Sequence, residues 1–165
     1  AVMKDAEMGP LVEQRALDSV TAKVENAIRQ GAKVLCGGHR VGDKGYFYAP
    51  TLLNQVTQDF DIVHEETFGP VLPIIEFEDI DTVIKWANDV EYGLASSVFT
   101  KDIDIATRIC RELKFGETYI NRWHFEAIQG FHAGVKKSGI GGADGKHGVE
   151  EYLVTHVTYL DTYED

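Results

Sequence analysis

The sequence predicts an α/β fold in which helices flank a mostly parallel, open sheet. Short apolar runs alternate with segments whose apolar residues recur at helical spacing. In the second half of the chain this gives the order strand, helix, strand, helix, strand over residues 71–77, 81–92, 94–99, 102–115 and 117–121. That order is typical of parallel α/β packing, because two parallel strands need a crossover connection between them.

The first half of the chain begins with a predicted amphipathic helix. Its apolar positions are Leu17, Val20, Val24, Ala27 and Ile28. Gly31 stands where a C-terminal cap is expected, since glycine adopts the left-handed conformation without strain. Residues 32–36 are then predicted to form a strand, and residues 46–56 an extended segment in which Pro50 excludes a helix.

Two later helices and the strands before them have recognisable boundaries. Asp81 and Asp102 are the predicted N-terminal caps. Residues 71–77 and 94–99 are nearly continuous apolar runs, as expected for strands buried on both faces. The second helix is expected to end before Gly116 and to turn five apolar residues inward, namely Ile103, Ala106, Ile109, Cys110 and Leu113.

The C-terminal region has a different character. A glycine-rich loop over residues 130–145 lacks the spacing of the common phosphate-binding motifs, so its glycines are expected to permit tight turns. A short helix over 147–153 follows. Residues 154–160 are rich in β-forming types and are predicted to be an edge strand that needs a partner.

Composition excludes several classes of protein. A net charge of −11 argues against binding to nucleic acid or to an anionic membrane surface. No apolar run approaches the ~18 residues of a membrane span, and no signal peptide is visible, so the chain is expected to be cytoplasmic. Two cysteines do not make a disulfide framework.

The cysteines and histidines give few functional signals. Cys36 and Cys110 are predicted to be buried, inert thiols. The six histidines show no metal-ligand spacing, so no metal site is expected. His132 draws interest because it lies in the glycine-rich loop beside Phe131, with an ordinary surface histidine as the alternative interpretation.

Glu65 and Glu66 are adjacent carboxylates, followed by Phe68. In an extended segment neighbouring side chains point to opposite faces, so the two carboxylates cannot act on one bond as a glycosidase pair does. Glu66 and Phe68 would lie on the same side, where a carboxylate could accept the hydroxyls of a ribose beside an aromatic ring. They are candidate nucleotide-binding residues, with a solvated acidic turn as the alternative.

Six segments, in order, resemble the C-terminal part of the NAD(P)-dependent aldehyde dehydrogenases, and the match covers essentially the whole chain. They are Met8-Gly9-Pro10-Leu11, residues 45–51, residues 65–70 (Glu-Glu-Thr-Phe-Gly-Pro), Tyr92-Gly93-Leu94, residues 116–121 (Gly-Glu-Thr-Tyr-Ile-Asn), and Lys137-Ser138-Gly139 followed by Gly148. The loop over residues 121–134 is similar to that of the lactaldehyde/glycolaldehyde dehydrogenase branch.

The resemblance implies a specific organisation and site. Residues 1–153 would be the C-terminal part of the catalytic domain, and residues 154–165 an oligomerisation strand and tail, with a homo-oligomer formed through residues 154–160. NAD or NADP would be the cofactor of the complete enzyme, with Glu66 holding the nicotinamide ribose and Phe68 packing beside the nicotinamide ring. Glu126 and His132 would line the aldehyde pocket, and two polar groups there suit a small hydroxylated aldehyde, such as lactaldehyde or glycolaldehyde.

The family mechanism also needs groups that precede the Met-Gly-Pro-Leu segment: a nucleophilic cysteine, a general-base glutamate and a Rossmann-like domain. Neither Cys36 nor Cys110 matches the nucleophile position. The chain is therefore expected to hold no catalytic residue, to bind no cofactor alone and to be inactive alone. The alternatives are a stand-alone, non-catalytic module that dimerises or binds a full-length subunit, and an independent enzyme that uses Cys36 or Cys110.

Overall fold

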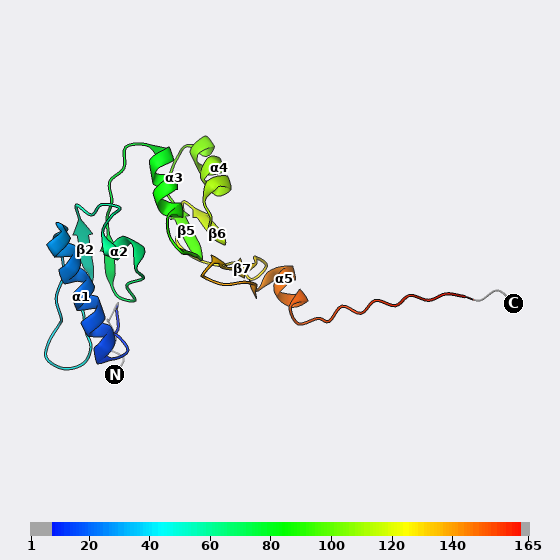
Figure 1. Cartoon of the computed structure of the whole chain (residues 1–165), viewed down its shortest axis with the longest axis horizontal. Helices are drawn as coiled ribbons and strands as arrows, with labels where there is room; N and C mark the ends of the chain where they lie inside the picture. Colours follow the sequence, from blue (N-terminus) through cyan, green and yellow to red (C-terminus); the bar gives the residue numbers. More distant parts are fainter. Residues whose placement is uncertain (1–7, 163–165) are drawn as a thin grey trace. The chain divides into compact units, whose positions relative to one another are not determined.

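A computed structural model describes residues 8–162 (Figure 1). The chain divides into two compact units, residues 1–86 and 87–165, and each is described by itself. Helix α3 (Ile80–Asn88) contains the boundary. Among the described residues, no helix is both long enough and apolar enough to cross a membrane.

The first unit is built on a three-stranded sheet in the order β1-β2-β3. Its elements are α1 (Gln14–Gln30), β1 (Lys33–Cys36), β2 (Thr51–Asn54), α2 (Asp61–His64) and β3 (Val71–Pro73). Strands β1 and β2 are antiparallel, with Val34 opposite Leu53, whereas β2 and β3 are parallel, with Leu52 opposite Leu72.

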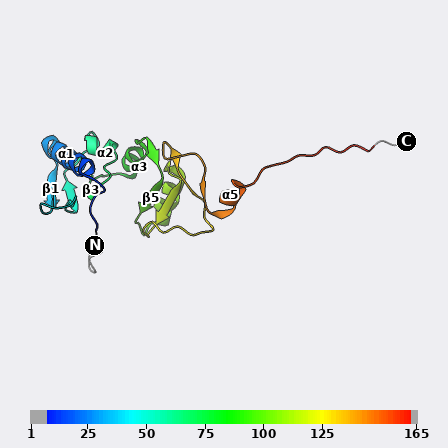
Figure 2. The same cartoon turned by 90° about the horizontal axis from the view of Figure 1, so that it is seen from below.

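Helix α1 supplies one side of the core of this unit and runs along the sheet (Figures 1 and 2). The predicted stripe is confirmed at four positions, because Leu17, Val20, Val24 and Ala27 are buried. They pack with Ala32, Tyr48, Leu53, Val56, Phe60 and Ile62. Gly31 ends the helix as predicted, with a left-handed φ of 119° that lets its N–H reach the last turn.

The second unit contains a parallel strand pair joined by a helix. Strands β5 (Ala95–Val98) and β6 (Glu117–Ile120) pair in parallel, with Ser96 opposite Thr118, and α4 (Ile103–Glu112) is the crossover. Asp102 caps α4 as predicted, because its carboxylate accepts the N–H groups of Asp104 and Ile105. Part of the predicted parallel α/β arrangement is therefore confirmed.

Short antiparallel pairs complete this unit. Strand β4 (Tyr92–Gly93) pairs with β8 (Val135–Lys136), and β7 (His132–Ala133) pairs with β9 (Gly142–Ala143). Helix α5 (Gly145–Glu150) follows directly. The predicted glycine-rich loop thus holds three two-residue strands, and it brings His132 to a fixed position beside Ala143.

The structure corrects several expectations about sheets and strands. Four small sheets are present in the described residues, with two parallel and three antiparallel pairings, so one mostly parallel sheet is not confirmed. The predicted strand over residues 71–77 is limited to β3, and Leu72 is exposed rather than buried on both faces. Residues 154–160 are exposed and lie in no strand, so the predicted terminal strand is not confirmed in the isolated chain.

Helix capping and burial differ from prediction at three points. Asp79, not Asp81, accepts the N–H of Thr82 at 2.8 Å and so stabilises the start of α3. On α4 only Ala106 and Ile109 are buried, and Ile103 and Cys110 are exposed because they lie off that narrow face. Cys36 is also exposed, at the end of the edge strand β1, so the prediction of two buried thiols is wrong for this chain.

Candidate functional site

The structure brings Glu66 and Phe68 to one hollow in the first unit. The segment after α2 leaves Phe68 in the left-handed region, at φ 50°, and the residue is 76% exposed. The hollow has a volume of about 610 Å³, and its lining includes Pro10, Leu11, Lys23, Glu66, Thr67 and Phe68. A carboxylate and an exposed aromatic residue therefore line one hollow, and an irregular segment rather than an extended strand places them.

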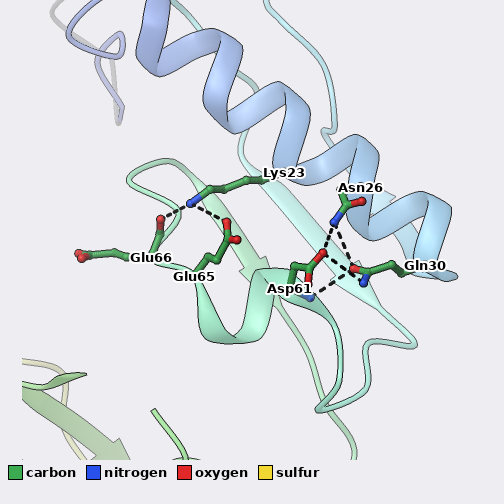
Figure 3. A network of polar contacts seen from close by, with 6 residues as sticks. All are labelled: Lys23, Asn26, Gln30, Asp61, Glu65 and Glu66. Carbon is green, nitrogen blue, oxygen red and sulfur yellow. Dashed lines mark hydrogen bonds and ion pairs between the residues drawn. The ribbon is translucent and has the colours of Figure 1, made fainter. Parts of the chain in front are cut away.

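Lys23 of α1 anchors this segment (Figure 3). Its ammonium group donates a hydrogen bond to the backbone oxygen of Glu66 and lies 3.6 Å from Glu65 Oε2. Figure 3 shows the Glu66 carboxylate pointing away from Lys23. That carboxylate makes no hydrogen bond or ion pair within residues 8–162, so its oxygens are available to a ligand.

A second set of contacts fixes α2 against α1. Asn26 Nδ2 donates to Asp61 Oδ2 at 2.7 Å, and Gln30 Nε2 donates to the same oxygen at 3.4 Å (Figure 3). After Phe68 the backbone passes so close to α1 that a Cβ at Gly69 would lie 2.5 Å from Val20 Cγ2. The sequence does not reveal the roles of Lys23 and Asn26, because both are only polar positions on an amphipathic helix.

The other two predicted residues, Glu126 and His132, lie together in the second unit. His132 Nδ1 is 3.5 Å from Glu126 Oε1 and 3.0 Å from Oε2 of a third residue, Glu117. Nδ1 itself is buried, and the contact with Glu117 is at hydrogen-bond distance but poorly aligned, so it is better described as an ion pair. Glu117 comes from β6 and His132 from β7, whereas Glu126 comes from the exposed loop between them.

Glu117 links the ring of His132 to a tyrosine. The hydroxyl of Tyr119 donates to Glu117 Oε2 at 2.7 Å, and this bond, with burial and nearby carboxylates, raises the pKa of Tyr119 to about 12. Contact with Glu117 also raises the pKa of His132, and burial opposes this with a smaller effect. The charges of Glu117, Glu126 and Asp144 raise the His132 pKa further, so the imidazolium form is favoured.

The same three residues form a possible ligand set for a cation. One ligand atom each from Glu117, Glu126 and His132 lies within 4.8 Å of the others. Spacing could not reveal this cluster, because its members come from a strand, a loop and a second strand. The absence of a metal site stays a prediction, and the short Tyr119 hydrogen bond already occupies the Glu117 oxygen.

Other residues of the family-like segments have structural roles. Asn121 joins β6 to the end of β5, since its side chain accepts the N–H of Thr100 and donates to the oxygen of Thr100, both at 2.8 Å. Ser138 Oγ accepts the N–H of Gly93 at 2.9 Å and so holds the glycine-rich loop against β4. These contacts explain why short polar residues stand at both positions.

The sequence profile of the aldehyde dehydrogenase family matches residues 1–158. The chain belongs to the aldehyde dehydrogenase family. It is 55% identical over 162 residues to lactaldehyde dehydrogenase of Escherichia coli (strain K12), covering 98% of this chain and 34% of that protein. It is 46% identical over 161 residues to 3,6-anhydro-alpha-L-galactose dehydrogenase of Vibrio sp. (strain EJY3), covering 95% of this chain and 34% of that protein.

Solved aldehyde dehydrogenase structures show the same fold. A structure of lactaldehyde dehydrogenase from Escherichia coli superposes with a TM-score of 0.93 at 55% identity, over 97% of this chain and 34% of that one. An NAD+ complex of aldehyde dehydrogenase from Bacillus cereus gives a TM-score of 0.86 at 39% identity, over 91% of this chain and 30% of that one. The chain thus has the aldehyde dehydrogenase fold and spans about a third of the length of these relatives.

Proposed function

We propose that this chain forms part of an aldehyde dehydrogenase that oxidises a small hydroxyaldehyde, such as lactaldehyde or glycolaldehyde, to its acid with NAD or NADP. The observation that carries this proposal is the meeting of Glu126 and His132, whose charged atoms lie 3.5 Å apart. Lactaldehyde dehydrogenase among the relatives supports the same substrate class. The complete enzyme is proposed to act in the cytoplasm.

The first unit would contribute to the cofactor site. The Glu66 carboxylate is without a polar partner among the described residues, and the Phe68 ring is exposed in the same hollow. These groups fit a nicotinamide riboside, because a carboxylate accepts ribose hydroxyls and an aromatic ring packs against a flat heterocycle. A nicotinamide held there would supply the hydride acceptor of the oxidation. Lys23 would keep the Glu66 backbone in place.

The second unit would contribute to the substrate site. A hydroxyl group loses its hydrogen bonds to water when it enters a pocket, so a pocket for hydroxyaldehydes must supply a donor and an acceptor. The His132 imidazolium is the donor and the Glu126 carboxylate is the acceptor. An aldehyde without the hydroxyl would give neither group a hydrogen bond from the substrate, which disfavours its binding.

The chain alone is proposed to be inactive. Neither Cys36 nor Cys110 matches the nucleophile position of the family, and the polar contact of Cys36 is a weak one to Pro50 O at 3.8 Å. The nucleophile, the general base and the dinucleotide-binding domain would come from the part of the enzyme that corresponds to the remaining two thirds of the relatives. Residues 1–153 are accordingly proposed as the C-terminal part of the catalytic domain.

Residues 154–160 are proposed to join subunits of a homo-oligomer. Val154, Val157, Tyr159 and Leu160 are all exposed in the chain, and Tyr159 is 93% exposed. Such residues favour addition to the edge of another sheet, where backbone groups and apolar side chains would both be satisfied. A stand-alone module that dimerises through this segment is the alternative function, and it predicts self-association without any aldehyde oxidation.

His132→Phe in the complete enzyme tests the substrate assignment. We expect kcat/KM for lactaldehyde to fall about tenfold, because a charged hydrogen bond to the hydroxyl is lost, while that for propanal changes by less than about threefold. The measurement is NADH formation with both aldehydes, and His39→Phe, an exposed histidine of the first unit, is the control. Equal losses with both aldehydes would contradict the proposed role of His132.

A further inference from the structure

Glu117 is the least exposed charged group around His132. It is the first residue of β6, its side chain is 17% exposed, and it faces Tyr119 because residues two apart lie on one side of a strand. A single oxygen, Oε2, receives the Tyr119 hydroxyl at 2.7 Å and lies 3.0 Å from His132 Nδ1. Oε2 therefore accepts a hydrogen bond from Tyr119 and forms an ion pair with His132, and it cannot reorient without losing both contacts.

This contact determines which part of the His132 ring is open to a ligand. The side chain of His132 is 30% exposed although its Nδ1 atom is buried, so the exposure belongs to other atoms of the side chain. When one ring nitrogen is held by a carboxylate, the other is left to bind or donate. The backbone of His132 is also fixed, because it pairs with Ala143 of β9.

Glu117 and Glu126 differ in what they can do. Glu126 is 46% exposed, lies farther from Nδ1 at 3.5 Å and belongs to the exposed loop, so it can turn toward a ligand. Glu117 is already committed to Tyr119 and His132. One carboxylate is thus suited to contact a substrate, and the other to hold the residue that does.

We infer that Glu117 is a positioning residue for substrate selection: it holds His132 by Nδ1, so that Nε2 carries a proton toward the hydroxyl of the aldehyde. The inference rests on the proposed hydroxyaldehyde specificity, and Glu117 itself does not touch the substrate. Its contact with the ring, together with the charges of Glu126 and Asp144, raises the pKa of His132 and so favours the protonated ring. Tyr119 keeps the carboxylate in place by donating a hydrogen bond to the same oxygen, Oε2.

Glu117→Gln in the complete enzyme is the decisive variant. The amide keeps the size of the side chain and can still accept from Tyr119, but it removes the charge that holds the imidazolium. We expect the KM for lactaldehyde to rise about tenfold with kcat within about twofold, and the KM for propanal to stay within about twofold. A ¹H–¹⁵N titration of the histidine rings, assigned with His132→Phe, should show a lowered pKa for His132.

Two matched controls accompany this variant. Glu112→Gln removes a carboxylate from an exposed ion pair with Arg108 on α4, and it should change neither KM nor the His132 titration. Tyr119→Phe, the control that separates the charge of Glu117 from its support, keeps the carboxylate but removes its hydrogen bond, so it should raise the KM for lactaldehyde by about threefold, less than Glu117→Gln does.

The outcomes separate this inference from the proposed function. Three results in Glu117→Gln would each overturn the positioning role. They are an unchanged ratio of the KM values for lactaldehyde and propanal, an unchanged His132 titration, and equal KM increases for both aldehydes. A wild-type enzyme that does not prefer the hydroxyaldehyde would contradict the proposed function instead.

Discussion

In the complete enzyme, Glu66→Ala is expected to lower kcat/KM for the cofactor about 100-fold, because a carboxylate that accepts two ribose hydroxyls contributes two charged hydrogen bonds. The Glu66 side chain has no polar contact with residues 8–162, so its removal should not change folding. Initial rates over a range of NAD concentrations, with circular dichroism of the folded variant, would measure this effect.

Two further variants distinguish the effect of the Glu66 carboxylate from that of the residues beside it. Glu65→Ala removes the neighbouring carboxylate, which pairs with Lys23 at 3.6 Å. We expect this variant to lower kcat/KM for the cofactor by less than about threefold. Lys23→Met removes the hydrogen bond to the Glu66 backbone and is expected to raise the KM for the cofactor about fivefold. If Glu66→Ala leaves both cofactor affinity and turnover at the wild-type level, the assignment of Glu66 is wrong.

The second large effect is expected from Gly116→Ala, which should lower the free energy of unfolding by about 3 kcal/mol. A Cβ at this position would lie 1.6 Å from Ala133 O and 3.2 Å from Leu94 O. Both neighbours are backbone atoms held by pairing, since Ala133 pairs with Gly142 and Leu94 O accepts the N–H of Glu117 at 3.1 Å. A methyl group at position 116 would therefore push β6 away from β7, next to the contact between Glu117 and His132.

Urea unfolding of the full chain, followed by circular dichroism, would measure this loss. Gly9→Ala is the matched control, because a Cβ there meets nothing within 4 Å and the residue has no left-handed φ. It should change the free energy of unfolding by less than about 0.5 kcal/mol. Wild-type stability of Gly116→Ala would show that β6 and β7 do not approach each other as described.

Local signals in the sequence were sufficient to predict the positions of most helices. Gly31 and Asp102 mark helix boundaries because their chemistry acts within one turn, and both predictions are confirmed. Asp79 was missed in favour of Asp81, since either of two nearby aspartates satisfies the same cap pattern. The exposure of Cys110 was also missed, because periodicity shows a stripe but not how much of it a partner covers.

Sheets and the C-terminal segment were harder to predict. Strand pairing depends on contacts between distant residues, and nothing in residues 71–77 or 94–99 specifies their partners. The predicted strand over 154–160 needs a second chain or further residues to pair with, and within residues 8–162 it finds no partner. An edge strand of this kind forms only when it pairs with another strand.

The side chains proposed to contact cofactor or substrate were predictable from the sequence, whereas the residues that hold them in place were not. Glu66, Phe68, Glu126 and His132 were chosen from motifs, and the structure brings them together in two pairs. Glu117 and Lys23 were missed because their roles depend on tertiary contacts. One signal for Glu117 was present, since a charged residue in a short strand, two positions from Tyr119, needs a partner if that face is covered.

We propose that this chain supplies cofactor and substrate contacts to an aldehyde dehydrogenase but no nucleophile. The most direct test is NADH production with glycolaldehyde and lactaldehyde by the purified chain, beside the same chain extended upstream to the length of its relatives. Activity in the extended form alone is the predicted result. Activity in the chain of 165 residues would contradict the proposal that it holds no nucleophile. The exposed thiols of Cys36 and Cys110 would then be the candidate nucleophiles.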